Sequence, residues 1–514
     1  MANQINNKLI ARNTAVLYLR MLFTLAVSLF TTRELLRILG VEDFGLYNVV
    51  GGVVLIFGFL NNAMIASSQR YISFALGEGN IDRQNKVFST SVLIHLTIAI
   101  VILLFAETIG LWFLNNKMTI PNDRIETVNW VYHAAIASFF FQILQVPFSS
   151  SVIAHEKMSY FAIVSVLESV LKLGIVYVLS ICSVDKLKLY ALLLLGVSLF
   201  NLLLYLFYTK IKFEECKFQL HFDIPLYKEM LSFAGWSFVG NFGVSVKDYG
   251  VNILLNIFCG PEVNAARGIA YQVMNAVNGF VSNFQTAMNP QITKRYAIGS
   301  IDSMISLIRN GCRYSFYLLS IIVIPLFIRS DYVLSIWLDR VPDLTIQFLR
   351  LALLMAMVNS MSGPLVIAMH ATGKIQVFQI TIALILSLDI PISYLLLKYG
   401  FSPYSVMFSA IMTALIGLIA RTILLNRLIK IDVKKFILNV IFRNFVIGFI
   451  MYIPAFFISR IIPLTFTGLL LFCIISILWS LIVIFISLSK SEKETIVTYI
   501  YSFISVRRKT SDSL

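Results

Sequence analysis

Apolar stretches of about twenty residues, separated by short polar segments, recur along the whole chain of 514 residues. A helix needs roughly 20 apolar residues to cross the hydrocarbon core of a bilayer. A transmembrane β-barrel would instead show segments of about ten residues in which apolar and polar side chains alternate. No such segments occur, so the pattern predicts an all-α, polytopic membrane protein with about 14 transmembrane helices.

Short loops separate the predicted spans, and lysine and arginine gather in the loops on the side of the two termini. The positive-inside rule places that side in the cytoplasm, so we expect both termini to be cytoplasmic. The basic stretch 421–443 and the tail 507–509 then act as retention charges that touch anionic lipid. The predicted spans are 14–34, 44–68, 88–113, 130–154, 160–183, 188–209, 231–258, 264–290, 312–328, 346–370, 375–397, 404–425, 441–459 and 465–488.

The composition agrees with this class, since 58% of the residues are hydrophobic, 13% are charged and the mean hydropathy is +0.84. A soluble protein carries about 25% charged residues. The net charge of +15 does not indicate a nucleic-acid partner, because the charges lie in the loops between spans. The five cysteines form no CxxC pair and the five histidines have no metal-ligand spacing, so we expect no metal, cofactor or catalytic residue.

Internal repetition divides the chain. "GVEDFGLYNVV" at 40–50 is echoed by "GPEVNAARGIAYQV" at 260–273, and "QRY" at 69–71 by "KRY" at 294–296. Six helices per copy give both copies the same orientation, which predicts a parallel repeat about an axis normal to the membrane. We therefore expect two six-helix lobes and two further helices with a cytoplasmic tail, at 1–215, 216–430 and 431–514.

The predicted span 264–290 carries a stripe of hydrogen-bonding side chains at helical spacing. An unpaired polar group in hydrocarbon costs about 4 kcal/mol or more, so lipid cannot cover such a stripe. Polar seams between close-packed helices are one alternative. A seam seldom needs eight such groups, so we favour a water-filled cavity. The stripe consists of Asn264, Arg267, Tyr271, Asn275, Asn278, Ser282, Gln285 and Asn289.

Two other spans have polar faces, and both carry charge. In 231–258, Asp248 belongs to a stripe with Asn241, Ser245, Asn252 and Asn256. Lys247 projects about 100° away, on a glycine face that another helix can approach closely. Adjacent residues on a helix do not face each other, so we do not expect Lys247 and Asp248 to form a simple local ion pair. Arg20 marks a weaker polar face of the first span.

The other intramembrane charges have structural explanations. Glu168 and Lys172 have the i,i+4 spacing of a helix pair that neutralises itself. Asp389 lies two residues before Pro391 and is expected to satisfy a kink. Arg20, Lys247 and Arg267 then outnumber Asp248, so the predicted cavity is positive. Guanidinium groups bind phosphate through paired charged hydrogen bonds, and amides suit sugar hydroxyls. The pattern favours an anionic, sugar-bearing cargo.

Four strings in the sequence are specific enough to suggest a family: "GVEDFGLYNVVGG", "GVNILLNIFCGPEVNAARGIAYQV", "FVSNFQTAMNPQITKRYA" and "ATGKIQ". Through them the chain resembles the polysaccharide transport family of the multidrug/oligosaccharidyl-lipid/polysaccharide exporter superfamily, and within it the O-antigen and capsular repeat-unit flippases. The resemblance implies a V-shaped two-lobe fold in the bacterial inner membrane. It also implies alternating access driven by an ion gradient, with an undecaprenyl-pyrophosphate-linked oligosaccharide as cargo. Membrane lipids and a polysaccharide polymerase with its chain-length machinery are the other expected partners.

With this cargo, we predict that Arg20, Lys247 and Arg267 meet the pyrophosphate and that Tyr271, Asn275, Asn278 and Ser282 bind the glycan. Asp248 is the predicted ion-coupling residue. Peptidoglycan-precursor flippases of the same family carry a further arginine on the second helix, where this chain has no charge before Arg70, which argues against that precursor as cargo. The rival functions are a drug/cation antiporter, usually twelve helices with an acidic cavity, and a membrane polymerase or ligase, which needs long outer loops.

Overall fold

The computed structural model describes residues 2–55, 58–117, 120–217, 223–338, 341–490 and 492–494. All regular secondary structure within these ranges is helical, which confirms the predicted all-α class. The predicted basic tail at 507–509 lies outside the described residues.

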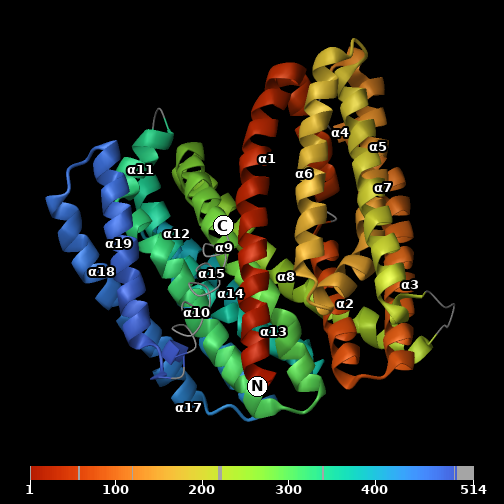
Figure 1. The fold of residues 1–514 in the computed structure, drawn as a ribbon. Helices are drawn as coiled ribbons and strands as arrows, with labels where there is room; N and C mark the ends of the chain where they lie inside the picture. The colour runs from red at the N-terminus through yellow and green to blue at the C-terminus, as the bar shows by residue number, and fades with distance from the viewer. Residues whose placement is uncertain are drawn as a thin grey trace, which may run out of the picture.

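The first half of the chain forms seven α-helices, and its long helices run up and down the bundle in Figure 1. Its elements are α1 (Ala2–Leu55), α2 (Gly58–Glu78), α3 (Ile81–Phe105), the π-helical turn η1 (Ala106–Gly110), α4 (Leu111–Lys117), η2 (Asn122–Arg124), α5 (Ile125–Ala154), α6 (Met158–Ile181), α7 (Lys186–Lys212) and η3 (Glu214–Cys216).

The second half of the chain is also helical and ends in two long helices, α18 and α19. Its elements are α8 (Ile224–Cys259), α9 (Pro261–Ala297), α10 (Ile301–Ile328), α11 (Ser330–Trp337), α12 (Thr345–Ser360), α13 (Ser362–Thr372), α14 (Gln376–Ser387), α15 (Asp389–Lys398), α16 (Ser405–Ile429), α17 (Val433–Phe436), η4 (Ile437–Phe442), α18 (Arg443–Ile461) and α19 (Phe466–Ser487).

Eleven helical segments among the described residues are long and apolar enough to span a membrane. The protein is therefore an all-α polytopic membrane protein. Helices α8 and α9 have 36 and 37 residues, long enough to cross a bilayer, but neither is among the eleven apolar segments. Their polar stripes lower their hydropathy, and helices of this kind need protein neighbours inside the membrane.

The two predicted repeats share a backbone conformation at their glycines. Gly40 interrupts α1 with φ 78° and ψ 171°, and Gly260 separates α8 from α9 with φ 85° and ψ 178°. Residues with a side chain rarely adopt this conformation, so both copies of the motif depend on glycine at the same point of the turn. The label α1 thus covers two helical segments that meet at Gly40, and the sequence predicts separate spans on the two sides of this glycine.

Two predicted spans are broken. The predicted span 375–397 forms α14 and α15 because Pro391 has no N–H for the carbonyl of Ser387 and its ring crowds that turn. The span 346–370 forms α12 and α13, and side chains of other helices bond the groups freed at this break. Gln285 donates to the carbonyl of Ser360 at 2.9 Å and the Cys312 thiol to the carbonyl of Met361.

Figure 1 shows α3 to α7 on one side of the molecule and α10, α11, α12, α18 and α19 on the other, with α1 between them. We call the end that carries the N-terminus, at the bottom of the figure, the lower end. The predicted domain boundaries fall between α7 and α8 and between α16 and α17. The division into lobes at those positions stays a prediction.

The glycine face of α8 packs closely against α14 and α15. A Cβ atom on Gly243 would lie 2.8 Å from Cβ of Ala383, and one on Gly250 would lie 2.8 Å from Cδ1 of Ile390. Glycine at these positions therefore allows the close helix contact expected from the sequence. Since Lys247 shares this face, its side chain enters the interface with α14 and α15.

Candidate substrate-binding and coupling site

A cluster of charged residues lies in the upper half of the bundle, where α8, α9 and α15 meet. Arg267 is buried, with 4% of its surface exposed. Its Nη1 donates to Oδ1 of Asn252 at 2.6 Å and its Nη2 to the hydroxyl of Tyr271 at 3.0 Å. Oδ1 of Asp248 lies 3.8 Å from the same Nη2. The structure thus brings together Arg267, Tyr271 and Asp248, as the two stripes predict.

Lys247 lies between two carboxylates. Its Nζ is 3.8 Å from Oδ1 of Asp248 and 3.9 Å from Oδ2 of Asp389, and the residue is 6% exposed. The flexible lysine chain brings its ammonium back toward Asp248, but the two residues do not form a simple local ion pair, because Asp389 of α15 shares the same ammonium. Lys247 reaches the α8–α15 interface, and its predicted contact with cargo stays a prediction.

Asp389 changes the charge of this cluster. It is 1% exposed and accepts a hydrogen bond from Ser393 at 3.4 Å. The break between α14 and α15 places it at the start of α15, opposite Lys247, so its structural role extends beyond the predicted kink. Lys247 and Arg267 are therefore matched by Asp248 and Asp389, and the expectation of a positive cluster is wrong at this level of the bundle.

The described residues contain no group of three or more His, Cys, Asp or Glu side chains that could hold a metal ion.

The polar stripe of α9 divides into bonded ends and a free middle. Asn275 and Ser282 are exposed, and within the described part of the chain no hydrogen bond is found for Asn275 or Asn278. Gln285, by contrast, donates to Ser315 Oγ at 3.0 Å and to the carbonyl of Ser360. The stripe is thus an interhelical seam at Gln285, as the alternative interpretation expects, and offers free amides above it.

Arg20 is the cation of the predicted site that has no acidic partner among the residues that the structure describes. Its Nη2 donates to Oδ1 of Asn283 at 3.1 Å and its Nη1 to Ser165 Oγ at 3.4 Å. Its guanidinium carbon lies 5.0 Å from the ring centre of Phe161. No ion pair of Arg20 with a carboxylate occurs among the described residues. The half-buried charge is held by neutral groups from α6 and α9 and stays available to an anion.

Comparisons with known proteins place this geometry. A family model described as "Polysaccharide biosynthesis protein" matches residues 10–295, more than half of the chain. The chain belongs to this family. A search of curated proteins found no match.

The solved structures that resemble this polysaccharide biosynthesis protein are transporters. An "Outward-facing conformation of a multidrug resistance MATE family transporter of the MOP superfamily" aligns with a TM-score of 0.73 at 12% identity, over 83% of this chain and 96% of that chain. "MATE transporter ClbM in complex with Rb+" aligns at 0.65 and 15% identity, over 84% and 96%. A MOP superfamily transporter from Pyrococcus furiosus aligns at 0.66 and 13%, over 83% and 97%.

These alignments establish the fold, which this chain shares with transporters of the MOP superfamily. The shares covered leave about a sixth of this chain outside each alignment.

The structure does not place the three predicted phosphate-binding cations together. Arg20 bonds Asn283, which lies 16 residues below Arg267 on α9. At 1.5 Å per residue this is roughly 24 Å of helix, far more than one pyrophosphate spans. The prediction that Arg20, Lys247 and Arg267 grip one pyrophosphate is therefore wrong for this conformation. Periodicity put Arg267 and Asn283 on one helix but gave no information about the level at which Arg20 meets it.

The sequence missed several residues of the site. Asn283 and Ser165 hold Arg20, yet neither lies on the predicted stripes, and Asp389 was assigned only to the kink. The signal that could have found Asp389 is the buried Lys247, since a buried cation in a membrane requires a partner. No comparable signal marks Asn283, because α9 carries many amide side chains and nothing in the sequence distinguishes this one.

Proposed function

We propose that the protein moves an undecaprenyl-pyrophosphate-linked oligosaccharide, an O-antigen or capsular repeat unit, across the bacterial inner membrane by alternating access. The lower end is cytoplasmic in this proposal, with both termini on that side. The observation that carries it is the pairing of Arg20, a cation without an acidic partner, with the free amides of Asn275 and Asn278 on the facing helix. A guanidinium suits a phosphate and amides suit sugar hydroxyls.

The site supports a division of roles along α9. Arg20 receives the pyrophosphate, while Asn275, Asn278 and Ser282 offer hydrogen bonds to the glycan above it. Tyr271 and Arg267 form the upper boundary of this surface, where the guanidinium is already bonded to Asn252. The lipid tail stays in the bilayer, and the match to a polysaccharide biosynthesis family supports a glycan cargo.

Deleting the gene in its host is expected to leave the lipid-linked oligosaccharide on the cytoplasmic face of the inner membrane. Since the transporter supplies the path for the polar headgroup, lectin labelling of right-side-out and inside-out vesicles measures the change. The wild-type gene should restore outward labelling. Unchanged labelling after deletion, with no second flippase gene present, would rule out this cargo.

A drug/cation antiporter is the second candidate, favoured by the solved multidrug transporter with this fold. Arg20 opposes it, because an unneutralised guanidinium in the path repels a cationic drug. Proteoliposomes loaded with a fluorescent cationic dye distinguish the two functions: gradient-driven dye efflux at the rate of oligosaccharide flipping supports the antiporter.

Asp248 is the proposed ion-coupling residue, because its side chain is 40% exposed whereas Asp389 is enclosed. An ion arriving from water therefore meets Asp248 first, and its binding loosens the contacts with Lys247 and Arg267. Asp248→Asn is expected to abolish the stimulation of flipping by a proton or sodium gradient in proteoliposomes while downhill flipping continues. Full gradient stimulation in the variant would exclude this role. Asp223→Asn, at the N-cap position just before α8 and outside the cluster, is the matched control.

A further inference from the structure

Two loops at the lower end occupy matching positions in the two repeats. The loop "AHEKM" at 154–158 follows α5, and "ATGKI" at 371–375 joins α13 to α14. Each contains a residue with left-handed backbone, Glu156 at φ 60° and Gly373 at φ 75°. Each also contacts the opposite half of the protein, where it meets the basic end of α9 or of α2, the ends that carry the related strings "KRY" and "QRY".

The contact of the first loop is a buried bond between charged groups of the two halves, which we call the Glu156 clasp. Oε1 of Glu156 accepts from Nζ of Lys294 at 2.7 Å, and Oε2 accepts from Nε2 of Gln291 at 2.6 Å. Glu156 and Gln291 are both under 9% exposed. Both carboxylate oxygens of Glu156, a residue of the first half, thus accept hydrogen bonds from α9 in the second half.

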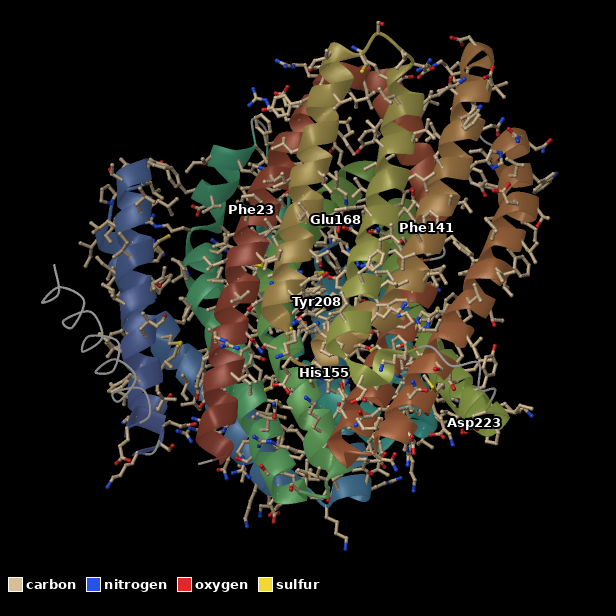
Figure 2. The ribbon with its side chains drawn as sticks, turned by 45° about the vertical axis from the view of Figure 1, so that its right-hand side comes forward. Phe23, Phe141, His155, Glu168, Tyr208 and Asp223 are labelled. Carbon is tan, nitrogen blue, oxygen red and sulfur yellow. The ribbon has the colours of Figure 1, made fainter. Side chains whose placement is uncertain are left out.

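The first loop is held firmly in its own half. His155 lies at the lower end of α5 (Figure 2), stacks on Phe213 at 3.9 Å between ring centres and bonds Oε1 of Glu215 at 2.5 Å. Burial raises the pKa of Glu215, but the hydrogen bond with His155, a backbone hydrogen bond and the electrostatic attraction to His155 together hold the pKa below its usual value. Asn13 of α1 donates to the Glu156 carbonyl at 3.2 Å. A fixed loop transmits any movement of α9 to the clasp.

The second loop makes its contact through backbone groups. Nε of Arg70 donates to the carbonyl of His370 at 3.2 Å, while its guanidinium carbon lies 4.1 Å from the ring centre of Tyr71. A Cβ atom on Gly373 would lie 2.6 Å from Nη2 of Arg70, so glycine is required where the guanidinium packs. A hydrogen bond from Tyr71 to Glu229 at 2.9 Å joins the halves beside it.

The identity of residue 156 needs an explanation. Left-handed backbone is unfavourable for glutamate by roughly 1 kcal/mol, and glycine, which stands at the matching position 373, adopts it freely. Non-glycine residues held in this region concentrate at functional sites. The Glu156 side chain has the one feature that glycine lacks, a carboxylate bonded across to Lys294 and Gln291.

We propose that the Glu156 clasp is a gate latch: it holds the lower end closed and sets the fraction of molecules in the conformation described above. When α9 moves away from the loop, Glu156 loses both donors and the path from the lower end to Arg20 opens. The Arg70 contact also joins the two halves, at the second loop. Arg70 donates to backbone carbonyls, however, and these are present whatever the loop sequence. The latch rests on the alternating access of the proposed function and does not depend on the cargo.

Hydrogen–deuterium exchange of the full-length protein in nanodiscs, without cargo, measures the latch. Glu156→Gln removes a charged hydrogen bond and is expected to shift the open-to-closed ratio roughly ten- to hundredfold. Peptides covering the lower ends of α2 and α9 should exchange faster, and those of α18 and α19 should not. Glu156→Gly should exchange equally fast although its backbone is unstrained, which separates the carboxylate from the strain.

A charge exchange tests the pairing itself. Glu156→Lys and Lys294→Glu should each open the lower end, and the double variant should return exchange close to wild type. Glu168→Gln, which removes an exposed pair with Lys172 on α6, is the matched control and should change nothing. Wild-type protection in Glu156→Gly, or no recovery in the double variant, would overturn the latch. Since no cargo is present, failure of the proposed cargo leaves this result unaffected.

Discussion

Replacing Arg20 by glutamine is expected to slow flipping of the lipid-linked oligosaccharide at least tenfold. A hydrogen bond to a charged group contributes about 1.5–3 kcal/mol, and glutamine removes the charge while keeping an amide for Asn283 and Ser165. In the described part of the chain, Arg20 has no carboxylate partner that the substitution would leave unpaired, so the variant should fold normally. Initial flipping rates in proteoliposomes, measured at equal protein content, give the effect.

Two variants make this result specific to charge at position 20. Arg20→Lys keeps the charge but loses the planar fork, so it should retain part of the activity. Arg33→Gln alters an exposed arginine further along α1 and should behave as wild type. Equal rates for Arg20→Gln and wild type would remove Arg20 from the cargo path.

Replacing Lys247 by methionine is expected to destabilise the protein by about 3 kcal/mol or more. The change leaves Asp389, which is 1% exposed, without its cation, and breaking one side of a buried pair typically costs about 3–5 kcal/mol. The midpoint of thermal unfolding in detergent, followed by intrinsic fluorescence, is the measurement.

A second substitution should recover most of that loss. In Lys247→Met with Asp389→Asn no uncompensated charge remains in the α8–α15 interface, so the stability should return toward wild type. Lys172→Met removes an exposed helix pair and should change the stability by less than about 0.5 kcal/mol. A double variant as unstable as the single one would show that Lys247 contributes through its packing.

The spacing of residues along the sequence predicted those features that lie within one helix. The glycine face of α8 and the stripe of α9 follow from spacing alone, and both are present in the structure. The spacing of apolar stretches also predicted the all-α membrane class, and composition and hydropathy support the same class. Pro391 indicated a kink in the span 375–397, but the break between α12 and α13 was missed because a hydropathy window averages over that junction.

Contacts between distant helices could not be predicted in this way. Whether Lys247 lies close to Asp389 depends on the direction that α15 takes after the break that follows α14. The 24 Å estimate between the levels of Arg20 and Arg267 depends on how α1 crosses α9. The sequence did not indicate a role for Glu156, because the residue lies in a short loop. Its left-handed backbone conformation is visible only in the three-dimensional structure.

The polarity of α8 and α9 has a consequence for how the protein is made. Neither helix is apolar enough to enter lipid readily by itself during synthesis, and α8 carries Lys247 more than 140 residues before its partner Asp389 is translated. The insertion machinery must therefore retain residues 224–297 beside it, or in contact with the completed first half, until α14 and α15 emerge. Biogenesis of this transporter is then a late, cooperative step, and truncation before residue 389 should yield a product cleared by membrane proteases.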